Sequence, residues 1–600
     1  MNTQQQTPKE QTQASATNMQ TQLEERRREL LAQAGLKDEP SKHFKRPKEH
    51  AFTAEQRANT TILLGGFTVR HDRLVKAGLE GLGYNIECVP VPTKADFQAG
   101  KEYGNNGQCN PTYFTVGALV NYLKNLRDKQ GMSTEDILKN YVFLTAGACG
   151  PCRFGMYEAE FRLALRNSGF DEFRVMLFQQ KGGLSQSDVQ AGLEMNLNFF
   201  LSLLNAIFIG DLLNEVAYHI RPYEVEKGKT DEVFERCIKL CENALRQKNY
   251  AAVQPGPIAK MLSKFTPVKN GEEAAKFIDQ MQSDWYADTL RQCMDLIDRE
   301  IAVDYTKAKP IAKITGEFWA QTTEGDGNFH MFSFLEREGA EVLVEPIATW
   351  ILYLLNQAKN LTKDRRGLRS DGTPAKSVLE KMKLETATQK KLFGVDLATK
   401  LVKREVERLR KALGGTAHEQ ACQLELTRAG HPYYHSRSAG GEGHLEVAKN
   451  IYYTQKELAH MVLSLKPFGC MPSTQSDGAQ AAVMANFSDM IYLPIETSGE
   501  GDINAYSRVQ MALGEAKQKT REEFKRAVRK TGYDLETIRA YVAEHKDLQR
   551  PLFHIPKHKG FIGRAANFVL AVGQRMDSDA AWSTRKSQAQ RQESVLEMVS

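Results

Sequence analysis

Cysteine followed two residues later by proline occurs at three widely separated places in the chain. These places are Cys109-Asn110-Pro111, Cys149-Gly150-Pro151 and Cys470-Met471-Pro472. At the second place a further cysteine, Cys152, completes a Cys-Gly-Pro-Cys motif. Thiolates at such turns can hold zinc or an iron–sulfur cluster, and a Cys-x-x-Cys pair can also carry out thiol–disulfide exchange. The spacing therefore indicates a metal centre or a redox dithiol.

The prolines predict how the local chain positions these thiols. Proline suits the first turn of a helix, because its missing N–H would be unpaired there anyway. The free N–H groups and the helix dipole favour a nearby anion, which makes a thiolate a better ligand. Cys149 and Cys470 also follow predicted strands, and ligands of an open α/β sheet bind beyond the carboxyl ends of its strands. We therefore expect the thiols to converge on one pocket.

Four interpretations of these cysteines were open, and the residues favour an iron–sulfur cluster. A thioredoxin-type dithiol normally faces a cis-proline loop, but no proline occurs between Pro151 and Pro222. Structural zinc usually has two Cys-x-x-Cys knuckles, and here one such pair is present. Dispersed cysteines at strand ends suit a cluster held between domains. A plainly structural role is the fourth interpretation, and it is the one we give to Cys88, Cys237, Cys241, Cys293 and Cys422.

The elements that must position the cysteines form an alternating pattern. Strands alternate with helices of ten to fifteen residues in two regions, which predicts an α/β fold with parallel sheets. The two regions could be distant copies of one another. The predicted organisation is an N-terminal tail (1–58), a first α/β domain (59–184), a helical region (185–305), a second α/β domain (306–528) with a helical insertion at about 350–428, and a basic C-terminal extension (529–600).

Composition limits the class of protein. A chain of 600 residues is too long for one compact core. Its net charge of +6 comes from 80 basic and 74 acidic residues, which gives no support for nucleic-acid binding. The most apolar stretch, 198–213, is too short to span a membrane, and no secretory signal is visible. Nine cysteines are too few for a disulfide scaffold, so we expect a cytoplasmic protein.

At its cysteine motifs the chain resembles the family of 2-hydroxyacyl-CoA dehydratase and benzoyl-CoA reductase subunits. It is most similar to the large proteins related to the activators of those dehydratases. The resemblance covers roughly 60–180 and 430–525. The segments that carry it are ACGPCRFGMYEAEFR and LKPFGCMPS and, more loosely, GQCNPTYFTVGAL and GGEGHLEVAKNIY.

This resemblance implies two flavodoxin-like domains with a [4Fe–4S] cluster in their cleft. It also implies that a separate ATP-hydrolysing activase, with its own cluster, delivers one low-potential electron. Cys152 is then the ligand expected from the Gly-Pro-Cys motif, Cys109 and Cys470 are two more, and Cys149 is the uncertain fourth. Three protein ligands would leave one iron open to a substrate, whereas four would leave electron transfer alone.

Two further stretches contain candidate site residues. Gly440, Gly441 and Gly443 precede a predicted helix and could offer N–H groups to a phosphate of CoA, with Glu442 as an acid or base. Glu496 stands at a predicted strand end, where a carboxylate could transfer protons. The alternatives are a loop whose glycines only permit tight turns and, after the strand, carboxylates that cap the next helix.

The residues leave three functions open. The first is a [4Fe–4S] electron-transfer protein that accepts electrons from an activase. The second is a catalytic dehydratase or reductase subunit that acts on an acyl-CoA thioester. The third is a zinc-binding or non-redox structural protein. We expect neither nucleic acid nor a membrane as a partner, and dimerisation is left open.

Overall fold

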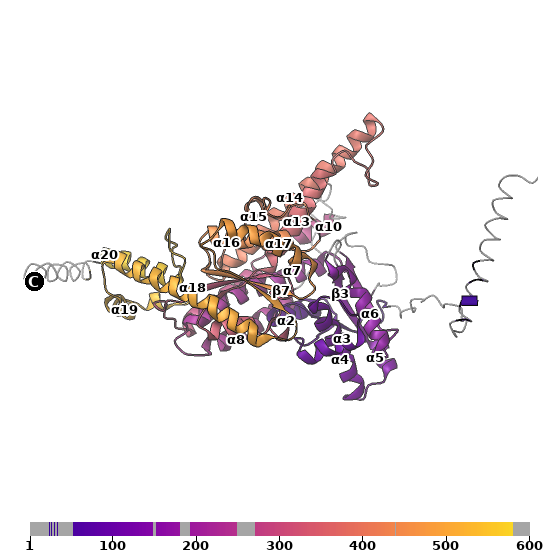
Figure 1. Cartoon of the computed structure of the whole chain (residues 1–600), viewed down its shortest axis with the longest axis horizontal. Helices are drawn as coiled ribbons and strands as arrows, with labels where there is room; N and C mark the ends of the chain where they lie inside the picture. Colours follow the sequence, from indigo (N-terminus) through magenta and orange to yellow (C-terminus); the bar gives the residue numbers. More distant parts are fainter. Residues whose placement is uncertain are drawn as a thin grey trace, which may run out of the picture. The chain divides into compact units, whose positions relative to one another are not determined.

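The computed structural model describes residues 52–147, 152–179, 192–248, 271–438 and 440–579, together with six isolated positions. Five of these positions are helical and lie in the first of two compact units, residues 1–48; they are Leu23, Arg26, Glu29, Leu30 and Gln33. Residues 49–600 form the second unit. The second unit contains all the elements described below, most of which are labelled in Figure 1.

Two four-stranded sheets form the centre of this unit, and every pairing in them is parallel. The first sheet has the order β2-β1-β3-β4 and the second has the order β6-β5-β7-β8. The prediction of an α/β fold with parallel sheets is therefore confirmed. The strands are β1 (Thr61–Leu64), β2 (Asn85–Cys88), β3 (Tyr141–Gly147), β4 (Arg174–Gln179), β5 (Ile311–Gly316), β6 (Glu341–Leu343), β7 (Met461–Pro467) and β8 (Tyr492–Thr497).

The second sheet contains short runs of residues that are buried as strands. Every residue of β5, β6 and β7 is buried, because helices cover both faces of the sheet. The polar residues in these strands have specific partners. The Nζ atom of Lys313 in β5, for example, lies 2.6 Å from a carboxylate oxygen of Glu345.

Helices of the first half connect its strands and continue beyond them. They are α2 (Val69–Glu80), α3 (Lys94–Tyr103), α4 (Asn110–Asp128), α5 (Thr134–Asn140), α6 (Tyr157–Asn167), α7 (Leu197–Ile220), α8 (Lys229–Gln247), α10 (Gly271–Gln282) and α11 (Trp285–Glu300). The stretch GKEYGNNGQCNP (100–111) was predicted as a loop, but residues 100–103 are the last turn of α3. A capping box of Thr93 and Asp96 starts this helix, so the loop before Cys109 is shorter than expected.

Helix α7 is the most apolar element of the described chain. Residues Leu197–Tyr223 have the length and composition of a membrane-crossing helix, but 83% of their most apolar window is buried within the protein. Leu213 and Val216 lie in the main core cluster, together with Phe234 of α8 and Ala348 of the second half. Helix α7 therefore lies in a hydrophobic core to which both halves of the unit contribute.

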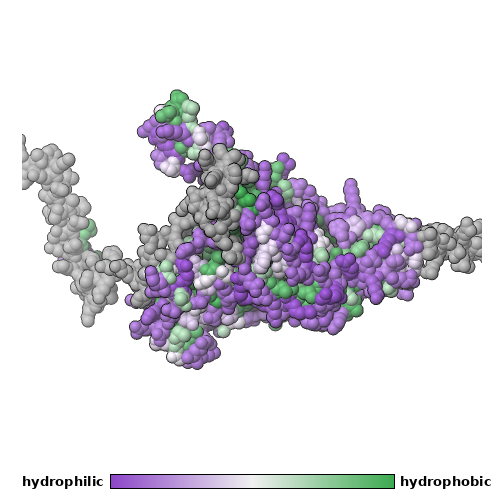
Figure 2. Space-filling view, turned by 180° about the vertical axis from the view of Figure 1, so that it is seen from behind, coloured by the Kyte–Doolittle hydropathy of each residue, from purple (hydrophilic) through white to green (hydrophobic). Residues whose placement is uncertain are grey.

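Helices of the second half include a projecting arm. They are α12 (Met331–Arg337), α13 (Ile347–Asp364), α14 (Val378–Ala412), α15 (Gln423–Gly430), α16 (Gly443–Gln455), α17 (Met471–Asn486), α18 (Asp502–Thr531), α19 (Leu535–Glu544) and α20 (Arg564–Ser578). The hairpin of α13 and α14 extends away from the sheets, and hydrophobic residues gather at its end (Figures 1 and 2). Val378, Leu379 and Met382 are exposed there.

Both ends of the second unit contribute to its core. Phe52 is buried in the main core cluster, so folded structure begins before residue 59. In the segment predicted as a basic extension, α20 packs on α18, and Phe568 and Val569 are fully buried. Residues 552–576 therefore complete the core from the carboxyl-terminal side.

Helices α3 and α4 cross so closely that glycine is required at the crossing. A Cβ atom at Gly117 would lie 1.7 Å from the backbone oxygen of Asp96. We expect Gly117→Ala to force the helices apart and to lower the free energy of unfolding by about 1–3 kcal/mol. Gly514→Ala is the control, because nothing lies within 4 Å of that position on α18, and it should stabilise the protein by up to about 1 kcal/mol. Urea unfolding of both variants would check the prediction, and equal midpoints would contradict it.

Candidate functional site

Cys109 stands directly before α4, as the proline two residues later predicted. It is the N-cap residue, with extended backbone, and Pro111 lies in the first turn. Its sulfur lies 3.2 Å from the Thr112 hydroxyl oxygen and 3.2 Å from the Tyr157 hydroxyl oxygen. The thiol is thereby held between the start of α4 and the start of α6.

Cys152 and Cys470 occupy matching places in the two sheets. Cys152 follows β3 and directly precedes a short 3₁₀ helix (Arg153–Met156) that continues into α6. Cys470 follows β7 and is the N-cap residue of α17. The helix after Cys470 begins at Met471, whereas the sequence pattern predicted a helix only after Asp477. β3 and β7 are each the third strand of their sheet in chain order, so both thiols lie at carboxyl ends of equivalent strands.

Backbone contacts join the Cys109 turn to the Cys470 turn. The N–H of Asn110 donates to the carbonyl oxygen of Phe468 at 3.1 Å. Gly469 has a φ of +76°, and a Cβ atom there would lie 3.3 Å from the Cα atom of Cys109. A larger residue at position 469 would therefore be strained and would push against the Cys109 turn.

The Cys152 turn contacts the segment before Cys109, and it lies next to Gly441, which also neighbours the Cys470 turn. Arg153 donates from Nη1 to the carbonyl oxygen of Gly107 at 2.6 Å, which ties it to the segment before Cys109. A Cβ atom at Gly441 would lie 3.5 Å from the Cβ atom of Cys152 and 2.5 Å from the Cγ atom of Pro472. The three cysteine turns, from both sheets, thus meet at one place in the structure.

Cys109 and Cys470 are buried and Cys152 is half-buried, and carboxylates lie near all three thiols. Cys109 and Cys470 are 6% and 5% exposed. Burial raises the pKa of all three thiols, and the Glu442 carboxylate raises the pKa of Cys152 and Cys470 further. The Glu317 carboxylate also raises the pKa of each of the three thiols. Such thiols become anions only when a positive charge lies among them.

Two carboxylates lie beside the cysteines. Glu317 follows β5, and one of its oxygens accepts from the N–H of Ala320 at 2.9 Å. Glu442 is the N-cap residue of α16, and it accepts from the N–H of Phe318 at 2.9 Å. Burial raises the pKa of both groups, the Glu442 carboxylate raises that of Glu317, and the Glu446 carboxylate raises that of Glu442. The pair therefore favours bound protons or a bound cation.

The three cysteines are not spaced as the ligands of one zinc ion are. Thiolates on a single tetrahedral zinc lie about 3.8 Å apart, as follows from a Zn–S bond of about 2.3 Å. Among the described residues, one group of three ligand atoms lies within 4.8 Å of one another, and it contains none of these cysteines. The sulfur atoms of Cys109, Cys152 and Cys470 therefore do not all lie within 4.8 Å of one another.

The other sequence-predicted site residues have different placements. Cys149 lies outside the described residues. Glu496 is exposed on β8, and no described contact links its carboxylate to the cysteines. Gly440 and Gly441 have positive φ angles, and a Cβ atom at Gly443 would lie 2.8 Å from the Tyr434 hydroxyl oxygen. Gly441 and Gly443 thus permit close packing of the loop against its neighbours.

Glu317 was missed by the sequence analysis. Its signal was a carboxylate directly after a buried strand of the second region, at the carboxyl end where sites of α/β sheets form. No model of a known protein family matches the chain, and no curated protein matches it. The site geometry is therefore the basis for a functional proposal.

Proposed function

We propose that the chain binds a [4Fe–4S] cluster through Cys109, Cys152 and Cys470, with Cys149 as the candidate fourth ligand. The observation that supports this proposal is the meeting of three helix-starting cysteine turns from two different sheets. When bound, such a cluster supplies one-electron redox chemistry. Electron transfer in a cytoplasmic, reducing compartment is consistent with the described cysteines, all of which are free thiols.

We also infer that each sheet with its helices is a flavodoxin-like domain. Both sheets have the strand order 2-1-3-4, counted along the chain within each half. The flavodoxin-like order begins in the same way, and its ligands bind where the strand order reverses, between the first and third strands. Cys152 and Cys470 each follow the third strand, and Glu317 follows the first strand of the second sheet.

The residues around the thiols favour a low-potential acceptor. Glu317 and Glu442 lie beside the thiols, and whenever either carboxyl group is ionised its negative charge opposes the addition of an electron. Such a site accepts an electron only from a donor with a very low reduction potential. We therefore propose a separate ATP-hydrolysing activase as the partner, because the chain contains no Walker-type phosphate loop.

A second candidate function, a dehydratase or reductase acting on an acyl-CoA thioester, is favoured by one observation. Burial and the Glu446 carboxylate raise the pKa of Glu442. The carboxyl group beside Cys152 can therefore hold a proton and donate it to a leaving hydroxyl group. In this function Glu442 is the general acid.

Anaerobic purification followed by metal and sulfide analysis tests the proposal. We expect a brown protein with about four irons and four sulfides per chain, and an EPR signal after reduction with dithionite. Colourless protein that contains zinc at the cysteines would overturn the proposal. Addition of a reduced activase, ATP and an acyl-CoA then separates the two functions. Reduction without turnover supports electron transfer, and loss of water from the thioester supports the enzyme.

A further inference from the structure

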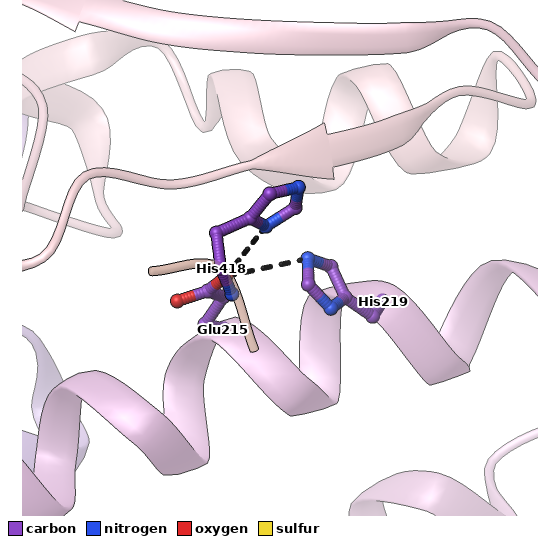
Figure 3. A group of neighbouring side chains, drawn as sticks. All are labelled: Glu215, His219 and His418. Atoms are coloured by element: carbon purple, nitrogen blue, oxygen red, sulfur yellow. Dashed lines mark hydrogen bonds and ion pairs between the residues drawn. The ribbon is translucent and has the colours of Figure 1, made fainter. Parts of the chain in front are cut away.

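We propose that Glu215, His219 and His418 form a second metal site, one that binds a single zinc ion. One ligand atom from each residue lies within 4.8 Å of the other two (Figure 3). An oxygen of Glu215 lies 2.7 Å from Nδ1 of His418 and 3.7 Å from Nε2 of His219. This site uses none of the cysteines and does not depend on the cluster.

The chain brings the three residues together from two directions. Glu215 and His219 are four residues apart on α7, so they share one face of that helix. His418 lies in the segment between α14 and α15, and its N–H also donates to Glu215. Because this contact joins residues far apart in the chain, the three ligands form no local metal-binding motif.

His219 supplies an independent indication of a ligand. Its side chain is 3% exposed, and neither ring nitrogen has a hydrogen-bond partner. A buried polar atom without a partner is costly, so such atoms call for an explanation such as a bound ion. A metal ion between Glu215, His219 and His418 would bind one of these nitrogens.

The geometry and charge suit zinc. Ligand atoms of tetrahedral zinc lie about 3.4 Å apart, since each bond is about 2.1 Å long. The two distances from Glu215, 2.7 Å and 3.7 Å, bracket that value. The neighbouring cations are already paired, because Arg564 contacts Glu341 at 2.8 Å and Lys313 contacts Glu345 at 2.6 Å.

Two imidazoles and one carboxylate are a ligand set that zinc uses with water in the fourth position. His418 is 34% exposed, so water can reach that side of the site. The ion would join α7 to the segment between α14 and α15. Its expected role is therefore to stabilise the contact between the core helix and the arm.

The test measures zinc binding by full-length protein after treatment with a chelator. We expect wild type to bind one zinc ion that survives Cys470→Ser, and this binding should raise the thermal midpoint. His418→Gln should lower the affinity for zinc by roughly 100-fold or more. Loss of a residue that only hydrogen-bonds to a metal ligand already lowers metal affinity by about 10–100-fold. His418 is partly exposed, so this variant should fold.

His431→Gln is the matched control, because His431 is exposed on a neighbouring loop. It should bind zinc as wild type does. Equal zinc affinity in wild type and His418→Gln would overturn the proposal. Zinc binding that disappears in Cys470→Ser would also overturn it, because the ion would then lie at the cysteines. Neither result would bear on iron content, so the two sites are tested separately.

Discussion

Replacement of Cys470 by serine is expected to remove most of the iron and sulfide from the protein. Cys470 is buried at the start of α17, and a serine hydroxyl there is a poor ligand for iron. We expect the iron content after anaerobic purification to fall by about tenfold or more, with loss of the EPR signal of the reduced protein. Circular dichroism should show that the helices remain.

Cys88→Ser is the control for this experiment. Cys88 lies in β2, and its sulfur donates to the backbone oxygen of Asp72 rather than facing the other cysteines. That variant should retain wild-type iron content. Cys149→Ser then determines the ligand number, because unchanged iron and an unchanged spectrum mean that Cys149 is not a ligand. Full iron content in Cys470→Ser would contradict the proposed cluster.

Glu345→Gln is expected to lower the free energy of unfolding by about 3–5 kcal/mol, because it leaves two buried lysines without their counter-ion. The carboxylate of Glu345 lies 2.6 Å from Nζ of Lys313 and 3.3 Å from Nζ of Lys449. All three side chains are almost completely buried. Burial lowers the pKa of Lys313, which shows how strongly its ammonium group depends on this partner.

The pH dependence gives this prediction a second test. Burial opposes ionisation of Glu345, but the two lysines outweigh it, and the net pKa is lowered. The contribution of Glu345 is therefore complete above the unfolded-state pKa of about 4.3 and is lost as the pH falls through the lower folded-state value. The difference between wild type and Glu345→Gln should be largest near neutral pH and should shrink in acid.

Glu385→Gln is the matched control for urea unfolding. Glu385 pairs with Arg366 at 2.6 Å on the exposed arm, where such pairs contribute about 0–1 kcal/mol. Similar urea midpoints for Glu345→Gln and Glu385→Gln would contradict the prediction. The buried network of Glu345, Lys313 and Lys449 would then contribute no more to stability than an exposed ion pair.

Much of the fold could be predicted because its signals are local. The apolar run YVFLTAG (141–147) predicts a strand, and β3 has the same bounds. The Cys-x-Pro turns also predicted that Cys109 would start a helix, since proline prefers that position. The Cys-x-Pro helix starts and the strand ends before Cys149 and Cys470 predicted that the thiols would converge, and the turns of Cys109, Cys152 and Cys470 lie close together.

Other features depend on contacts that no local pattern contains. The role of Gly117 follows from the crossing of α3 and α4, and α3 itself was partly predicted as loop. Glu496 has the strand-end position that we expected, but it is exposed, whereas its neighbours Ile495 and Thr497 on β8 are buried. His219 and His418 meet across about two hundred residues, and a periodic pattern cannot predict such a contact.

The repeated layout of the two sheets has a consequence for assembly. In each half a helix with a donor residue at its N-cap, Cys109 or Glu442, leads toward the third strand, and a cysteine follows that strand. One polypeptide thus contains the same strand order and a cysteine after the third strand twice. Because covalent linkage removes the entropic cost of bringing two subunits together, the donors can meet at any protein concentration, and dilution should leave the site intact.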